Sequence, residues 1–205
     1  MTIHTIGDSH SRDPWHKVPN TIVNWLGPKL CYTVTQRDIS FLKFRRPIKD
    51  NDTLVFCFGE IDCRAHIHKH ITKENTYKKQ IDSITNSYVS KIQEKVKTIE
   101  SKVTVAVFNV PPPPRDCDVK QNPNYPHVGT QEERRKYAKY FNKQLEKLCA
   151  HHGFVFVDVY DKHADSQGYS LVEEGDPVHI KNPEHVIEFL KTRNIQQAHD
   201  QNRRN

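Results

Sequence analysis

Several features that mark other classes of protein are missing from this sequence of 205 residues. The opening segment, MTIHTIGDSHS, has no basic region followed by a long apolar run, so we expect no signal peptide. No stretch approaches the roughly 20 apolar residues of a membrane span, and no Gly/Ser-rich linker divides the chain. We therefore expect a single domain over residues 1–193 with no membrane partner, followed by a polar, frayed tail over 194–205.

Cysteine pairs are also missing. The five cysteines are an odd number and none belongs to a CxxC pair: Cys31, Cys57, Cys63, Cys117 and Cys149. Without a secretion signal, this usage favours reduced thiols and predicts a cytoplasmic location.

The charge balance is basic, with a formal net charge of +6 and a pI of about 9.0. Lys and Arg are mixed with Asp and Glu along the chain, and there is no Arg-rich block and no RNA-binding aromatic motif. We interpret the excess as a solvated surface and expect no nucleic-acid partner.

Short apolar runs alternate with segments of helical periodicity. We expect strands over residues 2–6, 30–34, 53–58, 103–110 and 154–159. We expect helices over residues 15–26, 75–100, 130–153 and 183–191, the third opened by a capping box of Thr130 and Glu133. This alternation predicts an α/β fold with a mostly parallel sheet covered by helices on both faces.

Ligands of such sheets bind at the carboxyl ends of the strands. The first predicted strand ends in Gly7-Asp8-Ser9, the third is followed by residues 59–64, and four prolines at 111–114 cut off the fourth. We expect these three segments to open onto one edge of the sheet.

Two short motifs near the ends of the chain carry candidate chemistry. A serine hydroxyl is a weak nucleophile that needs a neighbouring base, and Asp176-Pro177-Val178-His179 supplies one. An aspartate three residues before a histidine can turn back to its Nδ1 atom and leave Nε2 facing the serine. We predict a catalytic triad of Ser9, Asp176 and His179.

The pair of motifs, GDSHS and DPVH, resembles the SGNH/GDSL hydrolase superfamily over residues 3–190. The resemblance implies a flavodoxin-like, three-layer α/β/α sandwich with a five-stranded parallel sheet, and no cofactor. It also implies deacylation or acyl transfer, commonly on esters or O-acetylated sugars, with Ser9 as nucleophile and Asp176 and His179 as its partners. The segment FGEIDCR, 58–64, resembles a subgroup often found near polysaccharide genes.

The sequence departs from this family at the oxyanion hole. The family's asparagine block, GxND, is here Gly59-Glu60-Ile61-Asp62, so Ile61 stands where an amide donor is expected. Losing one such donor costs roughly 3–4 kcal/mol of transition-state stabilisation. An ionised Asp62 accepts hydrogen bonds and cannot donate them, whereas Arg64 is always cationic.

Other groups are therefore candidates for oxyanion or substrate binding. The candidate for the family's oxyanion glycine is Gly27, and Gly59 belongs to the same set. Our hypothesis is that Asp62 orients Arg64 or the loop, and that Arg64 or backbone N–H groups bind the oxyanion. A purely structural Asp62–Arg64 salt bridge is an equal alternative.

Three histidines follow at alternating positions, which a strand would place on one face. We expect His66 to line the substrate site and His68 and His70 to be solvated. Structural zinc usually needs four protein ligands and no second cluster is evident, so we predict no metal site. The loop 125–129 is either a rim over the active edge or a plain connector. The remaining histidines are interpreted as surface or structural: His4, His16, His151, His152, His163, His185 and His199.

The sequence is compatible with three functions. The first is a serine esterase that removes O-acyl, chiefly acetyl, groups from a carbohydrate. The second is an O-acyltransferase that uses the same triad and a sugar hydroxyl in place of water. The third is an inactive scaffold that binds an anionic glycan or nucleic acid through its basic surface. The expected partner is a small-molecule or glycan ester, and the sequence leaves the oligomeric state open.

Overall fold

The computed structural model describes residues 1–120 and 122–193. Its centre is a five-stranded sheet in the order β2-β1-β3-β4-β5, and every neighbouring pair is parallel. The strands are β1 Ile3–Gly7, β2 Thr21–Trp25, β3 Thr53–Cys57, β4 Thr104–Phe108 and β5 Val155–Val157. The α-helices are α1 Cys31–Gln36, α2 Tyr77–Val96, α3 Gln131–His152 and α4 Glu184–Thr192. The expected α/β fold with a five-stranded parallel sheet is confirmed.

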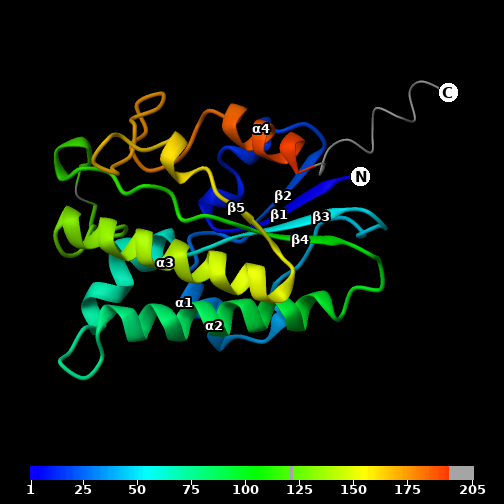
Figure 1. The fold of residues 1–205 in the computed structure, drawn as a ribbon, viewed down its shortest axis with the longest axis horizontal. Coiled ribbons are helices and arrows are strands. Elements are labelled where there is room, and N and C mark those ends of the chain that lie inside the picture. Colours follow the sequence, from blue (N-terminus) through cyan, green and yellow to red (C-terminus); the bar gives the residue numbers. More distant parts are fainter. Residues whose placement is uncertain (121, 194–205) are drawn as a thin grey trace.

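Helices cover both faces of the sheet and make three layers. Figure 1 shows α1, α2 and α3 on one face and α4 on the other. Strand side chains alternate between the two resulting cores: Leu54 and Phe56 of β3 pack with α2 and α3, while Val55 and Cys57 pack with Trp15 and α4. This period of two is what a strand buried on both sides requires.

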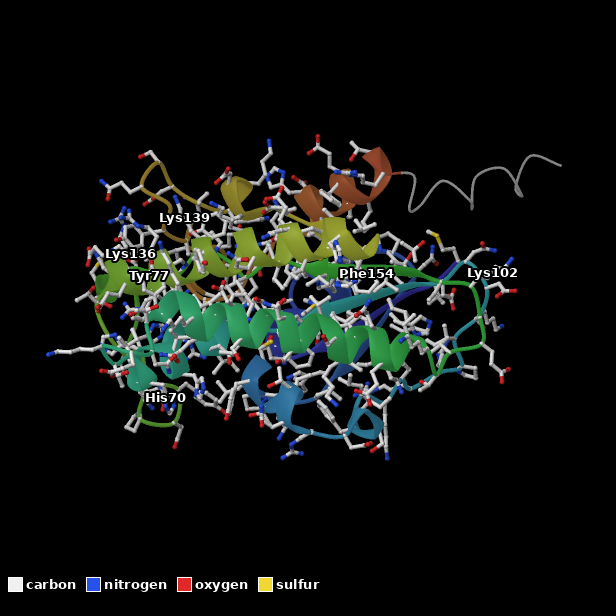
Figure 2. All side chains as sticks on the ribbon, turned by 60° about the horizontal axis from the view of Figure 1, so that its bottom comes forward. His70, Tyr77, Lys102, Lys136, Lys139 and Phe154 are labelled. Carbon is white, nitrogen blue, oxygen red and sulfur yellow. The ribbon has the colours of Figure 1, made fainter. Side chains whose placement is uncertain are left out.

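The loops that follow the strands gather at one end of the molecule. In Figure 1 the green segment after β4 and the orange segment before α4 lie at the end opposite the N-terminus. Helix α2 begins at this end, where the ring of Tyr77 packs 5.4 Å from that of Tyr137 on α3. Figure 2 shows Tyr77 and His70 here and Lys102 at the far end. Functional side chains on these loops are therefore brought together, as expected for a parallel sheet.

Two predicted elements were wrong. Residues 15–26 form a short 3-10 turn, Trp15–Lys17, and the edge strand β2 instead of a helix. Residues 30–34 lie in the helix α1 and its N-cap instead of a strand. The number of strands is still five, as expected, because β2 replaces the strand predicted at 30–34.

The other predicted elements are found within a few residues of their expected ends. The capping box of Thr130 and Glu133 is formed in both directions, and Gly153 ends α3 in the left-handed conformation. Among residues 1–120 and 122–193, no helix is both long and apolar enough to cross a membrane. All five cysteines are free and four of them are buried. The tail predicted for 194–205 lies outside the described residues.

Candidate active site

The end of β1 presents Ser9 at the carboxyl edge of the sheet. Gly7 fits tightly against β3, because a Cβ atom there would lie 1.9 Å from the carbonyl oxygen of Cys57. The Asp8 side chain then caps a 3-10 turn by accepting a 2.9 Å hydrogen bond from the backbone N–H of His10. Ser9 begins this turn, so its position is fixed by backbone contacts on both sides.

The loop before α4 brings the second motif to the same place. One carboxylate oxygen of Asp176, Oδ1, accepts hydrogen bonds from the backbone N–H groups of Val178 at 2.9 Å and His179 at 3.1 Å. This side-chain-capped turn folds the chain back on itself. The other oxygen, Oδ2, faces the His179 ring and the ammonium of Lys181.

Ser9, His179 and Asp176 form one continuous hydrogen-bond chain. Nε2 of His179 lies 2.8 Å from Oγ of Ser9, and Nδ1 lies 2.9 Å from Oδ2 of Asp176. Burial lowers the pKa of His179, and the neighbouring His10 lowers it further, against the raising effect of Asp176. The imidazole is therefore held in its neutral form, which can accept a proton at Nε2.

Asp176 is kept ionised by the groups around it. Burial pushes the pKa of its carboxyl up, but hydrogen bonds from Val178, Lys181 and His179 outweigh burial and hold that pKa well below its usual range. The ammonium of Lys181 lies 3.0 Å from Asp176 and 3.3 Å from the buried Asp13. Lys181 thereby ties the loop before α4 to the segment after β1.

The block that begins at Gly59 is helical. Gly59 has φ +119, and a Cβ atom there would lie within 3.0 Å of Phe141 and Val110, so no other residue fits. The following residues turn into a short π-helix, Asp62–His66, and a 3-10 turn, Ile67–His70. Ile61 lines the same cavity as Ser9 and His179 and has only an apolar side chain to offer it.

Asp62 caps the N-terminus of α1. Its fully buried carboxylate accepts hydrogen bonds from the N–H of Cys31 at 2.5 Å and of Tyr32 at 2.9 Å. Burial raises the pKa of Asp62 to about 7, against the effect of these two donors. These contacts cap α1 and do not reach Arg64, whose ionic partner is Glu60.

Arg64 pairs with Glu60, so the alternative of an Asp62–Arg64 salt bridge was wrong. Nε and Nη2 of Arg64 donate to the two oxygens of Glu60 at 2.7 Å and 3.2 Å, and Nη1 donates to the carbonyl of Tyr125 at 2.9 Å. Burial opposes ionisation of Glu60, but Arg64 and His10 hold its pKa below its usual value. Arg64 is thus fixed by three contacts beside the catalytic cavity.

Gly27 lies in the segment between β2 and α1, on the same side of the molecule. The N–H of Leu26 donates to the carbonyl of Gly7 at 2.9 Å, which ties this segment to the strand that carries Ser9. Trp25 and Pro28, on either side of Gly27, both line the catalytic cavity. The sequence missed Trp25 as a cavity residue because it placed Trp25 inside a helix.

A cavity of about 530 Å³ opens over the hydrogen-bonded chain. Its wall includes the loop after β4, which the sequence offered as either a rim or a connector; Tyr125 and His127 of that loop face the cavity, so it is a rim. Burial lowers the pKa of His127 to about 4, which leaves a neutral ring at the rim. The full set of lining residues is Ser9, Trp25, Pro28, Ile61, Arg64, Asp118, Val119, Lys120, Asn122, Tyr125, His127, Gly175, Pro177, Val178 and His179.

The three alternating histidines do not share one face, because their segment is helical and not a strand. His66 stacks on Tyr32 with ring centroids 4.7 Å apart and lines a neighbouring hollow of about 490 Å³, not the cavity over Ser9. His68 is half-buried against Tyr137, contrary to expectation, whereas His70 is exposed. Within the described part of the chain, no group of His, Cys, Asp and Glu side chains is placed to hold a metal ion.

His10 was not singled out from the sequence, although it is buried and its ring lies 4.9 Å from that of His179. Its place directly after the candidate nucleophile and two residues after Asp8 was the available signal. His4 and His163, interpreted as surface or structural, are buried and pair with Asp52 and Glu173.

Comparisons with known proteins address the fold. No family model and no curated protein matches the chain. Solved structures do match: a protein from Streptococcus pneumonia provisionally named a platelet activating factor has a TM-score of 0.64 at 15% identity, covering 94% of this chain and 83% of its own. A GDSL-like lipase from Bacteroides thetaiotaomicron VPI-5482 has a TM-score of 0.58 at 15% identity, covering 96% and 88%. The lipase/acylhydrolase from Enterococcus faecalis has a TM-score of 0.55 at 16% identity, covering 97% of each chain. The expected resemblance is thus confirmed at the level of architecture, and the protein has the α/β fold of the GDSL-like lipases and acylhydrolases.

Proposed function

We propose that the protein is a serine-dependent ester hydrolase that works through an acyl-enzyme intermediate. The observation that carries the proposal is the unbroken chain from Ser9 Oγ through His179 to Asp176, with distances of 2.8 and 2.9 Å. It lies at the wall of an open cavity, where an ester can reach the hydroxyl.

In the first step, Ser9 Oγ attacks the acyl carbonyl while Nε2 of His179 takes the hydroxyl proton. The tetrahedral intermediate collapses, and the alcohol leaves with that proton. Water then attacks the acyl-serine while Nε2 of His179 takes its proton, and the imidazolium returns that proton to Ser9 Oγ as the carboxylic acid leaves. Asp176 stays ionised throughout and stabilises the imidazolium. The oxyanion is assigned to the backbone N–H groups of Ser9 and Gly27, with the unused N–H groups of Arg64 as a further donor.

The proposed substrate is an O-acylated carbohydrate. Trp25 and Tyr125 leave 44% and 48% of their surface exposed at the cavity, and flat aromatic faces of this kind suit the apolar face of a sugar ring. Asp118, Lys120 and Asn122 on the same wall offer partners for hydroxyl groups. These groups support a sugar at the rim with its acyl group directed toward Ser9.

A second hollow of about 490 Å³ favours one variant of this function, O-acyl transfer. The hollow shares Pro28, Ile61, Arg64 and Tyr125 with the cavity over Ser9. A sugar hydroxyl held there could replace water in the second step.

The test combines an activated ester with a covalent probe. We expect p-nitrophenyl acetate to be hydrolysed and a fluorophosphonate to label the wild type, and Ser9→Ala to lose both. Ser40→Ala, which changes an exposed serine, should lose neither. O-acetylated monosaccharides should then have a higher kcat/KM than aryl acetates, and added sugar acceptors should give acylated products only if transfer occurs. Absence of both turnover and labelling in the wild type would instead support an inactive scaffold.

A further inference from the structure

A second histidine ring lies against the proposed catalytic base. The ring centroids of His10 and His179 are 4.9 Å apart with an interplanar angle of 30°. His10 is only 3% exposed, so water screens this contact poorly. Whatever charge His10 carries is therefore felt directly by His179.

The surroundings of His10 indicate which charge that is. Its Nδ1 lies 3.1 Å from Oδ1 of Asp8, and its Nε2 lies 3.3 Å from the carbonyl oxygen of Val178. A carboxylate and a carbonyl oxygen both accept hydrogen bonds. Only an imidazolium has a proton on each ring nitrogen to satisfy both, because either neutral tautomer would leave one lone pair facing an acceptor.

The burial of Asp8 is a second reason to conclude that His10 is positively charged. Its carboxylate is fully buried, and its Oδ2 has no hydrogen-bond partner among the described residues. Both contacts to Oδ1 come from His10, through its backbone and its ring. A neutral His10 would leave this carboxylate without a counter-charge, which is strongly unfavourable in a protein interior. Burial lowers the pKa of His10, but Asp8 outweighs burial and the net pKa is raised.

We propose that His10 is a positioning residue of the hydrolase proposed above, whose imidazolium keeps His179 in the neutral, proton-accepting form and holds the turn that carries it. The effect of His10 on catalysis rests on the proposed function, whereas its charge and its effect on the pKa of His179 do not. The second part of the role follows from the hydrogen bond to Val178, the residue directly before His179. His10 thus joins the two motifs through side chain and backbone.

The other charges near the two rings act in the opposite direction. Asp8 and Glu60 face His10, while Asp176 and Glu60 face His179. Glu60 is largely neutralised by its ion pair with Arg64, and Lys181 acts on His179 through Asp176. His10 is the charged group that lowers the pKa of His179, so it extends the range of the base toward acidic pH.

Asp8→Asn is the decisive variant. A protonated His10 and a neutral His10 predict changes of opposite sign in the pKa of His179. If the Asp8 carboxylate keeps His10 protonated, removing that carboxylate makes His10 neutral. The pKa of His179 then rises by about one pH unit. If His10 is neutral already, removal of a nearby negative charge leaves the pKa of His179 unchanged or lowers it. His10→Gln should raise it as well, and His151→Gln, an exposed histidine at the end of α3, should leave it unchanged.

The pKa values of both rings are measured by NMR titration of histidine-labelled protein, with His179 assigned through His179→Gln. We expect the pKa of His10 in the wild type to lie above the ordinary value of a histidine. The acid limb of the fluorophosphonate labelling rate of Ser9 should shift upward in parallel with His179 in Asp8→Asn. A protein that never reacts with the probe would overturn the proposed function, while the titration would still decide the role of His10. An ordinary or lowered pKa of His10 in the wild type overturns the inference even if neither variant folds.

Discussion

The guanidinium of Arg64 and the carboxylate of Glu60 form a two-point ion pair one helical turn apart, with N–O distances of 2.7 and 3.2 Å. Both residues are 8% exposed. The remaining contact of Arg64, to the carbonyl of Tyr125, anchors the rim loop of the cavity. The pair therefore links the block after β3 to the loop after β4.

Arg64→Ala should lower the free energy of unfolding by about 3–5 kcal/mol, because it leaves the buried Glu60 without a counter-charge. The double variant Glu60→Gln/Arg64→Gln removes both charges and should recover much of that loss. Urea unfolding of the wild type, the single variant and the double variant measures the difference. Equal losses in the single and double variants would show that the ion pair is not what stabilises this region.

The double variant also tests Arg64 as an oxyanion donor. If Arg64 donates to the oxyanion, the folded double variant should lose about 10²–10³-fold in kcat on p-nitrophenyl acetate with little change in KM. Full retention of kcat would assign the oxyanion to backbone N–H groups alone.

Ile61→Asn should increase kcat. Ile61 lines the cavity beside Ser9. It occupies the position at which the SGNH/GDSL superfamily, which the sequence resembles, carries an amide donor. A restored donor can contribute up to about 3–4 kcal/mol of transition-state stabilisation, so we expect a gain of at least tenfold. Ile61→Leu, which changes shape without adding a donor, is the matched control. An unchanged kcat in Ile61→Asn would mean that other groups of the protein already donate all the hydrogen bonds that the oxyanion accepts.

Local patterns predicted most of the fold. The buried run at 53–58 and the proline stop at 111–114 are properties of a few adjacent residues, and so is the capping box of Thr130 and Glu133. Each gave an element close to its observed bounds. Asp176 and His179 could be paired for the same reason, because the turn that aligns His179 is made within four residues by Asp176 itself.

The failures all involve contacts between distant parts of the chain. Helix α1 has only six residues, and its first N–H groups are capped by Asp62 from the other side of the site, which no local pattern reveals. Trp15 and Val18 suggested a helical face. They lie instead in a 3-10 turn and at the residue after it, and they pack on the face of the sheet that α4 covers. The pairing of Arg64 with Glu60 instead of Asp62 depends on the helical turn after Gly59, which places residues four apart on the same face.

Asp176→Asn should reduce kcat by roughly 10³–10⁴-fold, with KM nearly unchanged. The asparagine amide can still accept the backbone N–H groups of Val178 and His179, so the turn is kept. Its NH₂ group, however, would face Nδ1 of His179 and favour the tautomer that carries its proton on Nε2, which cannot take the proton of Ser9. Steady-state kinetics on p-nitrophenyl acetate tests this, with Asp161→Asn, an exposed carboxylate, as the control. A loss of less than tenfold would exclude Asp176 as the residue that sets the tautomer.

Asp62 should make the protein less stable as the pH rises toward neutrality. Burial raises the pKa of its carboxyl to about 7 in the native state, whereas an unfolded aspartate titrates near ~3.9. Between about pH 4 and about pH 7 the unfolded state therefore binds fewer protons than the native state, and the free energy of unfolding falls with increasing pH. Above about pH 7 both states are ionised at this residue and its contribution becomes flat.

Asp62→Asn isolates this contribution, because the amide does not titrate. The variant should be less stable than the wild type at pH 5, by about 1–3 kcal/mol, since one of the N–H groups of Cys31 and Tyr32 then faces an NH₂ group. The difference should narrow by pH 8, where the wild type carries a buried charge that the variant lacks. Urea unfolding at pH 5, 6, 7 and 8 measures it, with Asp161→Asn as the exposed control. A difference that is constant across this range would mean that the two backbone donors keep Asp62 ionised throughout, so that hydrogen bonding outweighs burial at the N-terminus of α1.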